Sequence, residues 1–273
     1  MRCARISCIL VFLFALAILI NGCSKVECKA AADCPKNTCM KASCADNKCK
    51  YSPIQNCCGN NIKDSLENGK PGNKCTCPGD YGICQGKISM EASGRAYESK
   101  YLEYFCKNEI CVLEVPLDKV RPVNLIDERD LRLFKIETVI NYNEPFDVSK
   151  DSFNFRLTLQ DDSQDIIFPI LISKILIKES ELLLGEKEVN QKLNGVGDSI
   201  SVNVPVSYKF ELPEEEKRVE YKINYEYNER VRDQRLPDGN YTYKQELARE
   251  SYESRFSTKV NIVRSGEADE ERN

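Results

Sequence analysis

Twelve cysteines confined to residues 28–111 constrain this chain more than any other feature of its sequence. They are Cys28, Cys34, Cys39, Cys44, Cys49, Cys57, Cys58, Cys75, Cys77, Cys84, Cys106 and Cys111. The same stretch has few aliphatic residues, so apolar burial alone cannot offset its conformational entropy. Disulfide bonds supply the missing stability in such segments and need an oxidising compartment. We predict a disulfide-rich region over 23–112, with residues 23–57 and 58–112 as candidate modules. Twelve cysteines allow roughly ten thousand pairings, so connectivity is left open.

Thiolate metal ligands are the alternative use of clustered cysteines. The candidates are Cys75-Thr76-Cys77, the Cys57-Cys58 pair and the evenly spaced Cys34, Cys39, Cys44 and Cys49. Structural zinc sites favour closer cysteine pairs, often with histidine, and the chain has no histidine. Iron–sulfur proteins use characteristic cysteine runs that do not occur here. We therefore predict disulfides, no metal site and no cofactor.

The start of the chain has the layout of a secretory signal peptide. Arg2 and Arg5 precede an apolar run over residues 9–20. A membrane-spanning helix needs about 20 apolar residues, and this run is shorter. The alternative is a short uncleaved anchor. We predict a signal peptide over residues 1–22 and export of the rest.

The end of that segment specifies the kind of signal. Ile20-Asn21-Gly22-Cys23 resembles the lipobox of prokaryotic lipoproteins, which implies a lipid on Cys23 and attachment to the outer face of the cell membrane or within the cell envelope. Diacylglycerol supplies the two chains that stable anchoring requires. The number of cysteines supports this assignment. Of 15 cysteines, Cys3 and Cys8 leave with the signal peptide, and lipidation of Cys23 leaves twelve, an even number that can pair completely.

A second resemblance covers residues 57–84. Cys58-Gly59-Asn60, followed by Cys75-Thr76-Cys77-Pro78-Gly79-Asp80, resembles a cysteine module of exported archaeal and bacterial proteins. Its usual form is Cys-Gly-Asn-Gly-x-Cys-Glu with a Cys-Pro-x-Asp-Cys ending. Lys63 and Tyr81 stand where that form has cysteines, which suggests one lost bridge between these two positions. The resemblance implies an extracytoplasmic stabilising or interaction module without catalytic residues.

A calcium site is a more specific possibility for residues 57–84. Its oxygen donors are Asn60, Asn61, Asp64, Glu67 and Asp80, which are ligand types that calcium takes. They do not follow the spacing of an EF-hand loop, and polar residues are common in any short module rich in turns. We therefore favour a structural role for them and predict no calcium site.

Beyond the cysteines the pattern changes to that of β-strands. Residues 113–124, with Pro116 and Pro122, are predicted to be a linker, residues 125–265 a sandwich and residues 266–273 a charged tail. Apolar and polar residues alternate in 153–159, 200–212 and 219–227, which indicates half-buried antiparallel strands. Further candidates are 131–142, 166–178, 181–186, 241–247 and 256–264. Pro205 suggests an edge strand or a bulge. The segment 245–255 could instead be a short helix.

Seven or eight strands in this span fit an antiparallel immunoglobulin-like β-sandwich, so we predict a mainly β protein. The sandwich has no cysteine or tryptophan and must rest on aliphatic and tyrosine packing. Tyr221, Tyr225, Tyr227, Tyr241 and Tyr243 could form a ligand platform, but core positions are favoured. Asn240-Tyr241-Thr242 is a candidate glycosylation site at Asn240.

The chemistry that the sequence lacks narrows the function. Without histidine the usual Ser-His-Asp and Cys-His hydrolases are excluded, and no phosphate-binding loop or nucleophile elbow occurs. We therefore predict no catalytic residues and no enzyme activity, with a histidine-independent extracytoplasmic enzyme as the least favoured alternative. Residues 116–273 carry 24 basic and 32 acidic residues, which argues against nucleic-acid binding.

Two function classes remain. The first is a membrane-anchored binding or adhesion module of the cell envelope that engages another surface protein through loops or an exposed edge strand. The second is a structural or accessory subunit docked permanently in an envelope assembly. A large apolar surface patch would favour the second class, and isolated polar loops the first.

The anchor prediction has a direct test. A Cys23→Ser variant is expected to lose labelling by a lipid precursor and to leave the membrane fraction, because only Cys23 fits the lipobox. Labelling and fractionation of the variant beside the unchanged chain measure both effects. Membrane retention of Cys23→Ser with residues 1–22 still attached would contradict the lipoprotein assignment and support the uncleaved anchor.

Overall fold

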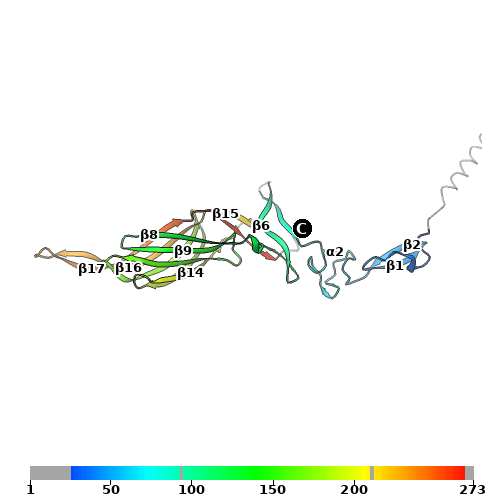
Figure 1. Ribbon diagram of the computed structural model, residues 1–273, viewed down its shortest axis with the longest axis horizontal. Helices are drawn as coiled ribbons and strands as arrows, with labels where there is room; N and C mark the ends of the chain where they lie inside the picture. The colour runs from blue at the N-terminus through cyan, green and yellow to red at the C-terminus, as the bar shows by residue number, and fades with distance from the viewer. Residues whose placement is uncertain (1–25, 93–94, 210–211, 268–273) are drawn as a thin grey trace, which may run out of the picture. The chain divides into compact units, whose positions relative to one another are not determined.

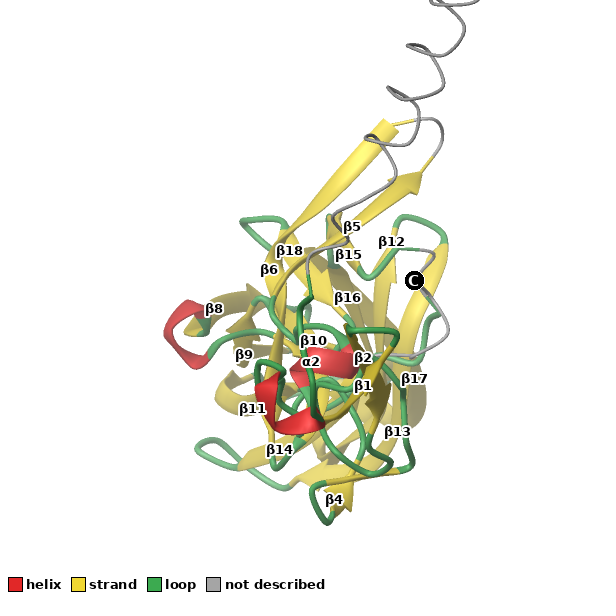
Figure 2. Cartoon of the chain, turned by 90° about the vertical axis from the view of Figure 1, so that its right-hand side faces the viewer, coloured by secondary structure: helices red, strands yellow, loops and turns green. Residues whose placement is uncertain are grey.

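The computed structural model describes residues 26–92, 95–209 and 212–267 (Figure 1). The predicted signal peptide, Cys23 and residues 268–273 of the predicted tail lie outside the described residues. Strand makes up 62% and helix 4% of the structure, so the prediction of a mainly β protein is confirmed. Figure 2 shows the few short helices among the strands. No helix in the described part is long and apolar enough to cross a membrane.

The chain divides into two compact units, Met1–Ile83 and Cys84–Asn273. This division lies inside the cysteine-rich region, before the predicted linker at 113–124. That linker segment contains the end of β7 (Ile110–Glu114), the 3-10 helix η2 (Leu117–Lys119) and the start of β8 (Arg121–Asp130). Residues 84–114 belong to the second unit because their strands pair within it and a Cys84–Cys111 disulfide closes them.

The first unit consists of short elements joined by turns. They are η1 (Ala31–Asp33), β1 (Met40–Ala45), β2 (Lys48–Pro53), β3 (Leu66–Glu67), β4 (Lys70–Pro71) and α2 (Pro78–Tyr81). β1 and β2 form an antiparallel hairpin in which Cys44 lies opposite Cys49. Asp46 and Asn47 form its turn with positive φ angles, which these residue types tolerate. Asp46 and Asn47 thus allow a tight turn between the two cysteines.

Disulfides take the place of an apolar core in the first unit. They join Cys28 to Cys44, Cys34 to Cys49, Cys39 to Cys57 and Cys58 to Cys77. Cys75 and Cys106 are also disulfide-bonded. Among the described residues of this unit, the only buried apolar side chains are Cys28, Cys34, Cys39 and Cys77. Each of the four bonds spans 15 to 19 residues, a loop length for which the chain-entropy model gives about 3 kcal/mol.

The second unit contains the sandwich. One sheet has the order β14-β11-β9-β8 and the other β13-β12-β16-β17. Their strands are β8, β9 (Phe134–Glu144), β11 (Ser152–Asp162), β12 (Ile166–Glu179), β13 (Leu182–Leu193), β14 (Ser199–Pro205), β16 (Glu220–Arg235) and β17 (Tyr241–Arg255). All pairings within these two sheets are antiparallel. The predicted antiparallel sandwich is confirmed, and the undecided segment 245–255 is strand.

The two sheets enclose one core. Residues 153, 155, 157 and 159 of β11 and residues 221, 223, 225 and 227 of β16 are all buried, as the period-two alternation predicts. Phe155 meets Tyr221 edge-to-face with ring centroids 5.5 Å apart, and Phe134 meets Tyr225 at 5.2 Å. Aromatic contacts of this kind add to the area buried. They hold the sheets together without cysteine or tryptophan.

Pro205 ends an edge strand, as its sequence position predicts. β14 pairs only with β11, and Pro205 is its last residue. The chain then crosses to the opposite sheet, where the backbone N–H groups of Ser207 and Tyr208 both donate to the Leu184 carbonyl. Gly185 permits this approach, since a Cβ there would lie 2.2 Å from the Pro205 carbonyl oxygen. The sandwich is closed along this side.

Two smaller sheets complete the second unit. One has the order β19-β7-β6-β5, built from β5 (Gly86–Ala92), β6 (Arg95–Lys107), β7 and β19 (Gly266–Glu267). The other has the order β10-β18-β15, built from β10 (Phe146–Asp147), β18 (Val260–Val263) and β15 (Glu214–Lys217). A small apolar cluster of Leu102, Leu113, Val115 and Val263 joins them.

Glu214 fastens these two sheets to each other. Its side chain is 8% exposed and lies on β15. One carboxylate oxygen accepts from the Tyr97 hydroxyl at 2.6 Å and from the Lys100 N–H at 2.8 Å. The other accepts from the N–H groups of Tyr101 and Leu102 at 2.8 and 2.6 Å. A carboxylate that accepts several hydrogen bonds is stabilised despite its burial.

Replacing Glu214 by glutamine is expected to lower the free energy of unfolding by about 2–4 kcal/mol, because the amide nitrogen would face donors in place of an acceptor. Urea unfolding measures the change. Glu216→Gln is the matched control: Glu216 lies on the same strand but its side chain is 49% exposed and pairs with Lys259. The control should change stability by about 0.5 kcal/mol or less. Equal losses in both variants would contradict the role of Glu214.

Buried tyrosines predict a loss of stability at alkaline pH. Burial raises the pKa of Tyr221, Tyr225, Tyr252 and Tyr97 in the folded chain. Above about pH 10 the unfolded chain loses these protons while the folded chain keeps them, so the free energy of unfolding falls as pH rises. The slope reaches about 1.4 kcal/mol per pH unit for each tyrosine. Urea midpoints between pH 8 and 11 measure it, and Tyr221→Phe should reduce the slope. An unchanged slope in that variant would contradict the assignment.

Candidate functional site

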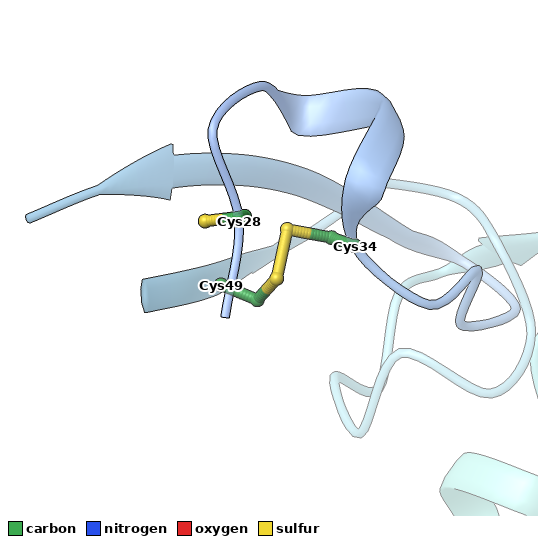
Figure 3. A group of neighbouring side chains, drawn as sticks. All are labelled: Cys28, Cys34 and Cys49. Atoms are coloured by element: carbon green, nitrogen blue, oxygen red, sulfur yellow. A yellow bond between two sulfur atoms is a disulfide. The ribbon is translucent and has the colours of Figure 1, made fainter. Parts of the chain in front are cut away.

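The clustered cysteines of the first unit are bridged to one another. The sulfur atoms of Cys28, Cys34 and Cys49 lie within 4.8 Å of one another, close enough to suggest a metal centre (Figure 3). Cys34 is bonded to Cys49, however, and Cys28 to Cys44. Oxidised sulfur is not a thiolate ligand, so this group holds the fold together.

The two positions where the resembled module has cysteines lie close together. The Lys63 ammonium lies 5.7 Å from the centroid of the Tyr81 ring. A cation over an aromatic face contributes modestly at an exposed site. The replacement of a bridge by these two residues stays a hypothesis.

The predicted oxygen donors of the module separate into two groups. Asp80 accepts the backbone N–H groups of Gly59 and Asn61, both at 2.7 Å, and thereby holds the loop after Cys58. Asn60, Asp64 and Glu67 form the second group. The Asp64 N–H donates to Glu67 Oε1 at 3.1 Å, and Asn60 Nδ2 donates to Asp64 Oδ2 at 3.4 Å. Asn60 and Glu67 are 2% and 1% exposed.

The second unit contains a groove of about 1040 Å³. Its lining comes from β6, β7, η2 and the corner between β9 and β11: Glu103, Phe105, Lys107, Glu114, Val115, Pro116, Leu117, Asp118, Val120, Asn143, Pro145, Asp147, Lys150 and Asp151. Leu117 is 90% exposed at its rim. The sequence does not indicate this groove, because part of its lining comes from residues 113–124, which are predicted to be a linker.

Both lysines of the groove already have acidic partners. Lys107 contacts Glu114 at 2.9 Å, and Lys150 lies 3.2 Å from Oδ2 of the buried Asp147. Burial opposes ionisation of Asp147, but hydrogen bonds from Ser265 and Ser149 outweigh it and hold its pKa below the ordinary value. The groove therefore offers an apolar surface whose two lysines are paired, a lining suited to binding.

The tyrosines singled out in the sequence divide between core and surface. Tyr221, Tyr225 and Tyr227 are at most 2% exposed and belong to the core, as predicted. The same prediction is wrong for Tyr241 and Tyr243, which are 40% and 54% exposed. The reason is length: the hairpin of β16 and β17 continues past the end of the sandwich core, so no opposite sheet covers the last residues of β16 and the first residues of β17 (Figure 1).

The extension of this hairpin has one face rich in tyrosine and arginine. Residues paired across an antiparallel ladder share a face, and neighbours along a strand alternate between faces. Tyr227 and its partner Ala248 face the core, so the next pairs on the opposite face are Asn228 with Leu247, Arg230 with Gln245 and Arg232 with Tyr243. The Arg232 guanidinium also lies 5.1 Å from the centroid of the Tyr241 ring. We call Arg230, Arg232, Tyr241, Tyr243 and Leu247 the Tyr–Arg face.

The arginines of the extension lack acidic partners. Among the described residues, no ion pair involves Arg230, Arg232 or Arg235, whereas Arg249, nearer the core, pairs with Glu226 at 3.3 Å. Leu247 is 53% exposed. Exposed tyrosine, leucine and unpaired arginine on one face resemble the composition of protein–protein interfaces.

Asn240 lies in the turn at the end of the same hairpin. Its side chain donates to Asp238 Oδ2 at 2.9 Å, and Thr242 Oγ1 accepts from the Gln234 N–H. The residue is exposed, so the predicted glycosylation site is accessible. Modification there remains a prediction.

Comparisons with known proteins give no family for this chain. No family model, no curated protein and no solved structure matches it.

Proposed function

We propose that this chain is an exported, lipid-anchored binding protein of a prokaryotic cell envelope, and that its Tyr–Arg face contacts an acidic surface of another envelope protein. The observation that carries the proposal is the face itself, with two unpaired arginines, Arg230 and Arg232, beside exposed tyrosine and leucine. The resemblance of residues 20–23 to a lipobox supports the anchor. The disulfides indicate an oxidising compartment, which agrees with export.

Charge distribution supports the choice of an acidic partner. Residues 116–273 carry more acidic than basic residues, yet the hairpin extension concentrates unpaired arginine. Arginine binds carboxylates in a planar, two-bonded geometry and stacks on aromatic rings, so it suits such an interface better than lysine. Association through this face should weaken with salt, since rim charges steer encounter and are screened.

A permanent docking role is the second candidate, and the groove favours it. An apolar groove with Leu117 almost fully exposed at its rim is a surface that a subunit of an assembly would cover. The Tyr–Arg face is preferred because its charges are uncompensated, whereas the lysines of the groove are paired within the unit.

Site-specific photocrosslinking in native membranes tests the proposal. A photoreactive phenylalanine analogue at Tyr243 is expected to capture one envelope protein, and the same analogue at Ser201, exposed on the outer side of β14, is the control. Arg230→Glu combined with Arg232→Glu should reduce capture at Tyr243 by at least about tenfold, because charge reversal at an acidic partner surface costs over 1.4 kcal/mol.

The outcomes separate the two candidates. Equal capture at Tyr243 and Ser201, or capture unaffected by the double charge reversal, would overturn the assignment to the Tyr–Arg face. Capture only from an analogue placed at Leu117 would favour the docking role of the groove. Thermal unfolding of each variant should match the unchanged chain, since all these side chains are exposed.

A further inference from the structure

Glu67 is a buried carboxylate with one oxygen left unpaired. Its side chain is 1% exposed, and Oε2 has no hydrogen-bond partner. Oε1 accepts from the Asp64 N–H at 3.1 Å. In the part of the chain that the structure describes, no lysine or arginine forms an ion pair with Glu67. An ionised carboxylate in this setting is strongly unfavourable unless a cation or a proton compensates it.

Asp64 supplies a second carboxylate in the same segment as Glu67. Asp64, three residues earlier, is itself without an ion pair among the described residues, and its Oδ2 accepts from the Asn56 N–H at 2.7 Å. The buried Asn60 side chain joins Asp64 Oδ2 to the Ile54 carbonyl oxygen, 2.6 Å from Nδ2. Asn60 Oδ1 in turn accepts the Ile62 N–H at 2.6 Å, so the Asn60 amide is fully used in holding this segment. Two carboxylates, those of Asp64 and Glu67, therefore lie in one braced segment.

The scaffold around these groups is rigid before any ion arrives. Cys39–Cys57 and Cys58–Cys77 fix both ends of the segment that contains Asn60, Asp64 and Glu67. The Tyr81 hydroxyl donates to the Asp64 carbonyl at 2.5 Å. Fixed ligands lower the ordering cost of ion binding.

We propose that Asp64 and Glu67 bind one Ca²⁺ ion, with Asn60 positioning them and water completing the coordination. The donors are all oxygen, which excludes soft metals, and the flexible coordination of calcium tolerates an irregular loop better than the strict octahedron of magnesium. Calcium sites in extracellular modules bind at about 10⁻⁴–10⁻³ M, a range in which two carboxylates suffice. The charge of the ion compensates the unpaired Glu67 oxygen.

This inference revises the sequence-based expectation of no calcium site in the module. The spacing of the donors does not follow an EF-hand, and that remains true. What the sequence does not show is that Glu67 is buried without a counter-charge while Asp80 is used elsewhere, as an acceptor for Gly59 and Asn61. The inference is independent of the partner proposed for the Tyr–Arg face.

Terbium luminescence on the full exported chain, with its disulfides intact, tests the site. Tb³⁺ replaces calcium, and Tyr81 next to Asp64 acts as the sensitiser. We expect saturable emission that calcium displaces, together with slower amide hydrogen exchange over residues 56–72 in millimolar calcium than in EDTA. Glu67→Gln should lower calcium affinity at least about tenfold, because it removes a charged ligand.

Two controls keep the test falsifiable. Asp238→Asn, in the exposed turn of the β16–β17 hairpin, should leave calcium binding unchanged. Mass spectrometry checks that the Glu67→Gln variant forms its disulfides. If it does not, Asp64→Asn is a second variant of the same site. Identical exchange in calcium and EDTA, or a calcium response retained by both site variants, would overturn the proposal. Equal protection by magnesium would overturn the assignment to calcium.

Discussion

The uneven supply of apolar side chains along this chain decides how each part is held together. The first unit buries cysteines where other domains bury leucine and phenylalanine, so covalent cross-links restrict its unfolded state in place of a core. The second unit follows the ordinary rule: two sheets enclose aliphatic and aromatic side chains, and the core continues as far as both sheets overlap. The distribution of apolar side chains also determines which of them stay exposed on the surface, where they can bind a partner. At the end of the β16–β17 hairpin, beyond the opposite sheet, Tyr241, Tyr243 and Leu247 have no core to pack against and stay exposed.

Buried carboxylates show how this fold treats polar groups that it removes from water. Glu214 has four donors and joins two sheets, so its burial is compensated by hydrogen bonds. Asp147 has the backbone and hydroxyl donors of its own turn and the ammonium of Lys150. Glu67 has a single donor and an unpaired oxygen. Three buried acids in one chain thus differ in one respect, the number of groups that compensate the charge, and only the least compensated one indicates an external ligand.

Cysteine placement in the hairpins illustrates how local and long-range order combine. Cys44 lies opposite Cys49, and Cys106 opposite Cys111, on either side of short polar turns. The two opposed cysteines of the first hairpin are not bonded to each other: Cys44 is bonded to Cys28 and Cys49 to Cys34. The turn sets the strand register, and the cross-links then attach the preceding segment to the hairpin. Such an arrangement cannot be obtained from spacing, because many pairings satisfy the same spacing.

The sequence by itself determined the properties that depend on residue type and period. These are the mainly β class, the inward residues of β11 and β16, the edge position of Pro205 and the oxidising compartment that the cysteines require. Tertiary structure decided what depends on length and neighbours. Tyr227 and Tyr243 follow the same alternation along a hairpin, yet one is buried and the other exposed, because only the first lies beneath the opposite sheet. Likewise Asp80 and Glu67 are equivalent as oxygen donors in the sequence. Only the folded loop shows that the first is satisfied by backbone N–H groups and the second is not, since burial and counter-charge are properties of the surroundings and not of the residue.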